Sequence, residues 1–134
     1  MLDLQKEFNK IQDSFHRISD IVYQTPILES SSINKILGAE ITFKAECLQE
    51  TGSFKLRGAS SAISILSEEE RSRGVVAFSS GNHAQGIAFA SRKLGTNAKI
   101  VMPSDAPKIK IQKTREYGAE VIFYDRDKDN REII

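Results

Sequence analysis

Residues 74–103 have the sequence GVVAFSSGNHAQGIAFASRKLGTNAKIVMP, in which a short apolar run, a helical segment and a second apolar run follow one another. Gly95 is placed to end the helical segment. The same alternation continues to residue 124. The expected elements are strands at 75–78, 98–102 and 121–124 and helices at 82–94 and 107–117. Strands that alternate with helices of about three turns are typical of a parallel sheet with right-handed crossovers, so the pattern predicts an α/β fold.

The residues before this region predict a helix-rich segment with one strand. Asp3 is a candidate N-cap for an amphipathic first helix that lies on a core, and the Thr25-Pro26 pair ends it. The apolar stripe of that helix comprises Leu4, Phe8, Ile11, Phe15, Ile18 and Val22. The later expected elements are a short helix capped within 30–32 and ended by Gly38, a strand at 40–46, a helix from near Phe54, and a helix with a capping box at Ser67 and Glu70.

Composition narrows the class of protein. The chain has 134 residues, 40% hydrophobic and 28% charged, which is the balance of one globular domain. Its net charge of +1 comes from interleaved charges, so the sequence shows no cationic stripe for nucleic acid, and small molecules are the expected partners. Cys47, His16 and His83 have no metal-ligand spacing. No stretch resembles a signal peptide or a transmembrane span, so we expect the cytoplasm.

Two segments place unusual residues where ligands bind in such folds, outside the carboxyl ends of strands. The first is TGSFKLRG at 51–58, with Lys55 in the first turn of its helix. The second is SSGNHAQG at 79–86, which runs from a strand into a helix N-terminus. Unpaired backbone N–H groups and the helix dipole make such an N-terminus suited to a carboxylate or phosphate.

Each segment alone has an ordinary explanation. A lysine in a first helical turn is usually a solvated charge, and Ser79, Ser80 and Asn82 are typical of a helix N-cap. His83 is more often a capping or packing residue than a base. A dinucleotide site is disfavoured, because the glycines of 79–86 do not form the close triplet that such sites need.

Together, SFKLRGA at 53–59 and SSGNHAQ at 79–85, which begins 24 residues after Lys55, closely resemble the fold type II pyridoxal-phosphate enzymes. The similarity is greatest to threonine dehydratase, serine racemase and threo-3-hydroxyaspartate dehydratase. It extends over nearly the whole chain, from Thr25-Pro26 to YDR at 124–126. The resemblance implies pyridoxal 5'-phosphate as cofactor and a three-layer α/β fold, with helices on both faces of a parallel sheet.

The resemblance also implies roles for individual residues. Lys55 matches the lysine that forms the imine with the cofactor and takes the substrate α-proton. Phe54 matches a residue beside the cofactor ring, and Asn82 matches an asparagine that hydrogen-bonds the ring hydroxyl. Ser80 matches the opposite-face acid or base of racemase-like members, and Arg131 matches an arginine that approaches a substrate carboxylate. The loop that holds the substrate α-carboxylate corresponds to Ser79, Ser80, Gly81, Asn82 and His83.

Enzymes of this group are longer, and part of their site lies beyond position 134. Their glycine-rich loop for the cofactor phosphate and the residue that meets the pyridine nitrogen have no counterpart here. We therefore expect an N-terminal fragment with an incomplete fold, inactive alone. Residues 1–73 match the N-terminal piece of the large cofactor domain, and residues 74–134 match a truncated, mobile small domain.

The leading hypothesis is a pyridoxal-phosphate-dependent dehydratase, or ammonia-lyase, that converts L-threonine or L-serine to a 2-oxo acid and ammonia. The alternatives are a serine racemase or a threo-3-hydroxyaspartate dehydratase. Arg131 favours the latter, because a second substrate carboxylate needs a cation. A non-catalytic module that binds a small anion or a partner chain is an alternative of another class. The resemblance further implies an amino-acid substrate and a dimeric parent protein, and the isolated histidines predict no metal ligands in the site.

Overall fold

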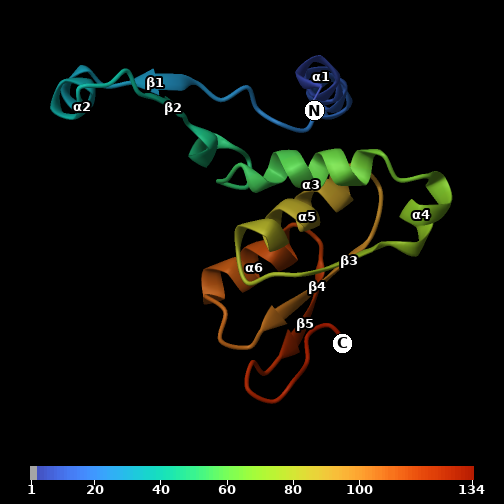
Figure 1. Ribbon diagram of the computed structural model, residues 1–134. Helices are drawn as coiled ribbons and strands as arrows, with labels where there is room; N and C mark the ends of the chain where they lie inside the picture. The colour runs from blue at the N-terminus through green and yellow to red at the C-terminus, as the bar shows by residue number, and fades with distance from the viewer. Residues whose placement is uncertain (1–2) are drawn as a thin grey trace.

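The computed structural model describes residues 3–134, in which helices and strands alternate along the chain (Figure 1). The helices are α1 (Leu4–Ile18), α2 (Ser31–Leu37), α3 (Lys55–Ser64), α4 (Glu68–Arg73), α5 (Asn82–Lys93) and α6 (Lys108–Glu116). The strands are β1 (Ile27–Glu29), β2 (Thr42–Lys44), β3 (Val75–Phe78), β4 (Ala98–Pro103) and β5 (Glu120–Tyr124), and a 3-10 turn covers Glu46–Leu48. Within this described part, no helix is both long enough and apolar enough to cross a bilayer.

Strands β3, β4 and β5 form a parallel sheet with β4 in the middle. Ile100 of β4 pairs with Ala77 on one side and Val121 on the other, and all three side chains belong to the core or pack against it. Helix α5 connects β3 to β4, and α6 connects β4 to β5. The strand and helix alternation predicted for residues 75–124 is confirmed.

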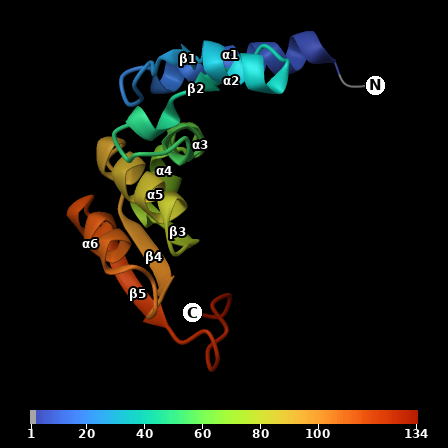
Figure 2. The same ribbon diagram turned by 90° about the vertical axis from the view of Figure 1, so that its left-hand side faces the viewer.

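Helices α5 and α6 lie on one face of this sheet, and α3 and then α1 stack beyond α5 (Figure 2). α5 packs against β3 and β4, α6 packs against β5, α3 packs on α5, and α1 packs on α3. Two right-handed crossovers that run in the same direction place both connecting helices on the same side. The predicted α/β class with a parallel sheet is confirmed. Helices on both faces are not seen among residues 3–134, because Val76 and Phe78 are exposed on the second face.

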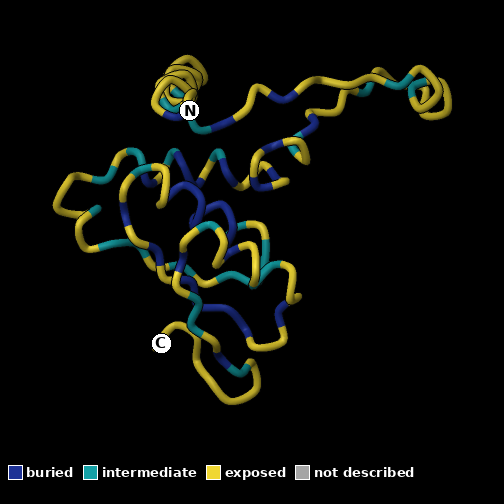
Figure 3. The backbone as a smooth tube through the Cα atoms, turned by 180° about the vertical axis from the view of Figure 1, so that it is seen from behind, coloured by how far each residue is buried: buried dark blue, intermediate teal, exposed yellow. Residues whose placement is uncertain are grey.

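The core lies between α3, α5 and the sheet. Its least exposed hydrophobic side chains, each 0% exposed, are Leu56, Ala84, Ala90, Ile100 and Met102. Residues 84–91 of α5 are all buried, because α3 covers one side of this helix and the sheet covers the other. Figure 3 shows this buried centre in dark blue. Small residues in α5 permit this enclosure, since they let neighbouring backbones approach closely.

β1, α2 and β2 form an arm that extends away from the stacked helices (Figure 1). β1 and β2 pair antiparallel, and α2 has the predicted caps, with Ser30 at its N-terminus and Gly38 in a left-handed conformation at its end. The strand expected at 40–46 covers only Thr42–Lys44. β1 has no counterpart among the expected elements, because three exposed residues carry no alternation of apolar and polar side chains.

Helix α1 begins as predicted, since the Asp3 carboxylate accepts a hydrogen bond of 3.1 Å from the Lys6 N–H. The expectation that its apolar stripe lies on a core is wrong for most of the helix. Ile18, in the last turn, is its buried residue. The pattern shows which face is apolar, but the neighbouring α3 covers only part of that face. Stripe residues that are 44–74% exposed are Leu4, Phe8, Ile11 and Phe15.

Candidate active site

Lys55 is the first residue of α3, where the chain leaves a loop. Phe54 holds the N-cap position with helical backbone angles and makes no side-chain cap hydrogen bond. The Lys55 Nζ atom lies 5.1 Å from the centroid of the Phe54 ring, within the range of a cation–π contact. Both side chains are exposed. The predicted helix start near Phe54 is confirmed, and Lys55 lies in the first turn.

The loop at 79–81 connects β3 to α5. The Ser79 N–H donates to the Val101 carbonyl at 3.1 Å, and the Ser79 hydroxyl accepts from the Gly81 N–H at 3.3 Å. Gly81 occupies the N-cap position of α5, and no side chain caps this helix. The interpretation of Ser79, Ser80 and Asn82 as ordinary capping residues is therefore wrong. The N–H groups of the first turn keep their capacity to bind an anion.

Close packing of α3 on α5 brings Lys55 and this loop together. A Cβ atom on Gly86 would lie 3.1 Å from the Lys55 carbonyl oxygen and 3.2 Å from its carbonyl carbon. His83, one turn before Gly86, is half-buried, and burial together with the Lys55 ammonium lowers the pKa of its imidazole. Sequence reasoning missed the packing role of Gly86, whose only signal was a glycine inside a helical pattern.

Asn82 is exposed at the start of α5, and its orientation is set by α6. The Lys110 Nζ atom donates a hydrogen bond of 2.6 Å to the Asn82 Oδ1 atom, which leaves the amide N–H groups free to donate. Lys110 was not a candidate residue, since nothing in its local sequence distinguishes it from the other lysines nearby. The contact connects residues 28 apart in the chain.

Arg131, in the segment that follows β5, contacts the residue just before the loop at 79–81, on the sheet face that carries no helix. Its guanidinium carbon is 4.3 Å from the centroid of the Phe78 ring, and Phe78 directly precedes Ser79. Among the described ion pairs, the guanidinium of Arg126 is held by Asp105 at 2.9 Å, whereas none includes Arg131. Lys55, the loop at 79–83 and Arg131 thus come from three separate parts of the chain and lie around one edge of the sheet.

A family model described as pyridoxal-phosphate dependent enzyme matches residues 18–134. The chain belongs to this family. The resemblance to pyridoxal-phosphate enzymes that the motifs at 53–59 and 79–85 indicate is therefore confirmed.

Several relatives of this pyridoxal-phosphate-dependent family member have assigned activities. It is 50% identical over 127 residues to L-threo-3-hydroxyaspartate ammonia-lyase of Saccharomyces cerevisiae, covering 95% of this chain and 39% of that protein. It is 52% identical over 113 residues to L-threonine ammonia-lyase of Thermotoga maritima, covering 84% of this chain and 28% of that protein. The structure of maize serine racemase superposes with a TM-score of 0.88 at 41% identity, covering 93% of this chain and 38% of that one. The chain thus spans less than two fifths of the length of these relatives.

The residues present fit the cofactor of the family. Thr51 Oγ1 and Ser53 Oγ are buried without a hydrogen-bond partner, in the loop that leads into Lys55. A buried hydroxyl without a partner costs about 1–3 kcal/mol, so such groups are often completed by a ligand or water. The Lys55 amine can bond to the aldehyde of pyridoxal phosphate, and the Asn82 amide and these two hydroxyls can donate hydrogen bonds to its oxygen atoms. By contrast, no three His, Cys, Asp or Glu side chains in residues 3–134 are grouped to hold a metal.

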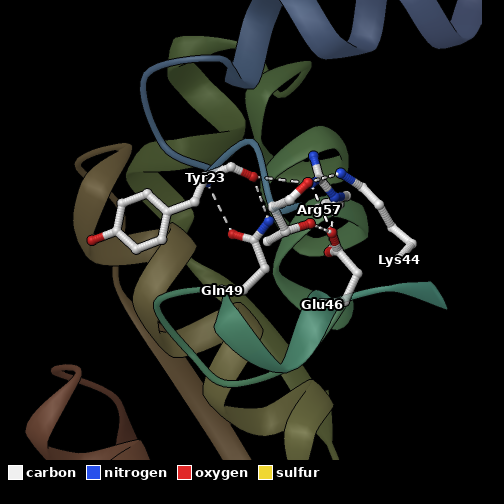
Figure 4. Close-up of polar contacts among 6 residues, drawn as sticks. Tyr23, Lys44, Glu46, Gln49 and Arg57 are labelled. Carbon is white, nitrogen blue, oxygen red and sulfur yellow. Dashed lines mark hydrogen bonds and ion pairs between the residues drawn. The ribbon is translucent and has the colours of Figure 1, made fainter. Parts of the chain in front are cut away.

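A polar network holds the first turn of α3 through Arg57 (Figure 4). The Arg57 guanidinium donates to both Glu46 carboxylate oxygens, Nε to Oε2 at 2.9 Å and Nη2 to Oε1 at 2.8 Å. The Thr25 hydroxyl donates to Glu46 at 2.5 Å. The Gln49 side chain accepts from the Tyr23 N–H at 3.0 Å and donates to the Tyr23 carbonyl at 2.7 Å. This network connects the segment after α1 to the 3-10 turn and to α3.

The Glu46 carboxylate makes stability depend on pH. Hydrogen bonds from Arg57, together with those from Thr25 and Gln49, lower the pKa of Glu46 to about 2 from an ordinary value of 4.5. A carboxylate with a depressed folded-state pKa stabilises the fold above its unfolded-state pKa, and this contribution is lost as pH falls from 4.5 toward about 2. We expect Glu46→Gln to lower the free energy of unfolding at pH 7 by about 1–3 kcal/mol and to flatten the pH dependence in that window.

Urea unfolding of both proteins across this pH range measures the effect. Glu69→Gln is the matched control, because Glu69 pairs with Arg73 at 3.6 Å on the exposed surface and should contribute little. Parallel stability curves for wild type and Glu46→Gln in acid would contradict the prediction.

Proposed function

We propose that the whole protein is a pyridoxal-phosphate-dependent ammonia-lyase that converts L-threonine or L-serine to a 2-oxo acid and ammonia. This chain supplies Lys55, Phe54 and the loop at 79–83 to the proposed active site. The observation that carries the proposal is the position of Lys55 at the start of α3, against the uncapped N-terminus of α5. The assigned activities of relatives near 50% identity support the same class of reaction.

The roles follow from the chemistry of each side chain. The Nζ atom of Lys55 would hold the cofactor covalently and would move the proton at the substrate Cα atom. Asn82 would donate its amide N–H to the cofactor ring hydroxyl, and Phe54 would lie beside the ring. When bound, the cofactor ring acts as an electron sink for the bond that breaks at Cα. Ser80 exchanges a proton on the opposite face.

The substrate α-carboxylate fits the first turn of α5. N–H groups there lack a side-chain cap, and the helix dipole adds a partial positive charge. We assign this binding to the loop Ser79, Ser80, Gly81, Asn82 and His83. Because the pKa of His83 is lowered by burial and by Lys55, its imidazole is neutral at pH 7 and can donate or accept one hydrogen bond.

The organisation of the parent protein is part of the proposal. Residues 1–73 are assigned to the large cofactor domain and residues 74–134 to a mobile small domain, of which the described residues form three paired parallel strands. The contact of α3 with α5 is then the joint between them. A cytoplasmic homodimer is proposed for the whole protein, with the exposed apolar side chains of α1 available for burial.

A threo-3-hydroxyaspartate dehydratase is the second candidate, and Arg131 favours it. A second substrate carboxylate needs a cation near the loop at 79–83, and Arg131 lies over Phe78 without an ion-pair partner in the described set. In the full-length protein we expect Arg131→Gln to lower kcat/KM for hydroxyaspartate about tenfold to a hundredfold, with a small effect on threonine. Activity confined to threonine in the wild-type protein would exclude this candidate. Conversion of L-serine to D-serine would instead identify a racemase.

The test of the cofactor assignment is reductive trapping. Pyridoxal phosphate is added to the purified chain, borohydride reduces the bond between the aldehyde carbon and the amine, and peptide mass spectrometry locates the modified lysine. Selective modification of Lys55 supports a competent half-site. Modification spread over surface lysines would favour the alternative of a non-catalytic module that binds a small anion or a partner chain.

A further inference from the structure

We propose that the ion pair between Glu46 and Arg57 is a positioning element that sets the direction of the Lys55 side chain. The significance of this direction for catalysis rests on the function proposed above. The ion pair itself, and its effect on Lys55, can be tested without cofactor.

The start of α3 needs such an element because nothing local defines it. Phe54 makes no side-chain cap hydrogen bond, whereas Asp3, Ser30 and Ser67 cap α1, α2 and α4 through their side chains. A helix without a cap has free N–H groups in its first turn, and its first residues fray readily. Lys55 is the first of these residues, so its side-chain direction depends on what holds the next turn.

Arg57 is held in a geometry that a single charge contact would not provide. Its guanidinium uses two nitrogen atoms on the two oxygen atoms of Glu46, and Nη2 also donates to the Tyr23 carbonyl at 3.0 Å. The Arg57 and Glu46 side chains are 28% and 14% exposed, compared with 60% and 42% for the surface pair of Lys10 and Glu7. Paired nitrogen–oxygen contacts fix orientation as well as distance. The ion pair therefore restrains rotation of α3 about its axis.

The acceptor is itself held in place. The Thr25 hydroxyl holds the Glu46 carboxylate, and the Gln49 side chain holds the Tyr23 backbone, through the hydrogen bonds shown in Figure 4. The Lys44 ammonium donates to the Thr25 carbonyl on the same side. Because these partners come from the segment after α1, from β2 and from the end of the 3-10 turn, the carboxylate is held by contacts other than the one with Arg57.

Helix geometry converts the restraint on Arg57 into a direction for Lys55. Successive residues turn by about 100°, so two residues apart the side chains leave the axis on nearly opposite sides. Leu56, between them, is fully buried. With Arg57 held by Glu46 and Leu56 in the core, Lys55 is directed to the loop at 79–83, where its ammonium acts on His83.

His83 provides a readout that needs no cofactor. The chain has two histidines, so proton NMR resolves His83, with His16 on α1 as the internal reference. If Lys55 loses its direction, its charge moves away and the pKa of His83 rises. We expect this rise in both Arg57→Lys, which keeps the charge but loses the paired contacts, and Glu46→Gln. Removing the Glu46 charge by itself would shift the pKa of His83 downward, so a rise separates loss of direction from a simple change in charge.

Arg73→Lys is the matched control, because Arg73 pairs with Glu69 on the exposed face of α4 and should leave His83 unchanged. Circular dichroism establishes that each variant is folded under the conditions of the titration. A pKa of His83 that stays or falls in either folded variant overturns the proposal. If Glu46→Gln does not fold, Arg57→Lys alone decides.

Reductive trapping adds an independent measurement. We expect the rate of modification at Lys55 to fall severalfold in both variants, while modification of surface lysines is unchanged. If wild-type Lys55 is not modified at all, the cofactor assignment for this chain fails, and the NMR titration still decides whether Glu46 and Arg57 direct Lys55. The two proposals can therefore fail separately.

Discussion

Lys55→Arg abolishes the borohydride-stable attachment of pyridoxal phosphate to the peptide that contains residue 55; this is the largest effect that we expect. The reaction needs an uncharged amine that can add to an aldehyde, and a guanidinium stays protonated at any working pH. The substitution keeps a positive charge beside Phe54 and His83, so the fold at the start of α3 is preserved. Quantitative peptide mass spectrometry before and after borohydride measures the loss.

The control for this experiment is another lysine in a structured position. Lys99 lies in β4 and pairs with Glu120 at 3.4 Å on the exposed surface, away from both site segments. Lys99→Arg should leave modification at residue 55 unchanged. If Lys55→Arg and wild type instead show the same total modification, the attachment is non-specific and Lys55 has no special reactivity in this chain.

Gly86→Ala should destabilise the fold, although alanine is the better helix former. Alanine in place of glycine normally stabilises a helix interior by up to about 1 kcal/mol. Here the new Cβ atom would lie 3.1 Å from the Lys55 carbonyl oxygen and 3.4 Å from the Leu56 nitrogen. Both are backbone atoms, so α3 must shift as a unit. We expect a net loss of about 1–3 kcal/mol in the free energy of unfolding, and slower modification of Lys55.

Gly58→Ala is the matched control, because Gly58 lies in α3 itself and its added Cβ atom would meet nothing within 4 Å. This variant should gain about 0.5–1 kcal/mol, as expected for a helix interior. Urea unfolding compares the two variants with wild type. Stabilisation by both substitutions would show that α3 and α5 do not approach as closely as the structure indicates.

The predicted elements that were confirmed most closely are those with strong local signals. The strands at 75–78 and 98–102, the capping box at Ser67 and the start of α3 each depend on residues adjacent in the chain. The short strand β1 and the exposed stripe of α1 were missed or wrong. In both cases the outcome depends on which other segment lies alongside, and this information is not local.

In the candidate site, too, features with a local sequence signal could be predicted, whereas contacts between distant segments could not. The motifs around Lys55 and Asn82 could be recognised, and the roles assigned to Phe54, Ser80 and Arg131 remain predictions. Lys110 and Glu46 could not be found in this way, because each acts on the site through a long side chain from another element. Polar contacts of this kind leave no periodic pattern in a sequence.

The amino-acid sequence alone determined the α/β class, the order of elements after residue 74, and the two motifs that identify the family. These follow from hydrophobic period, caps and short-range spacing, which operate within a few residues. The tertiary structure alone decided that α3 meets α5 at Gly86, that α5 has an open N-terminus, and that Glu46 holds Arg57. These features depend on backbone approach and on directed hydrogen bonds between distant residues, which only the packed chain defines.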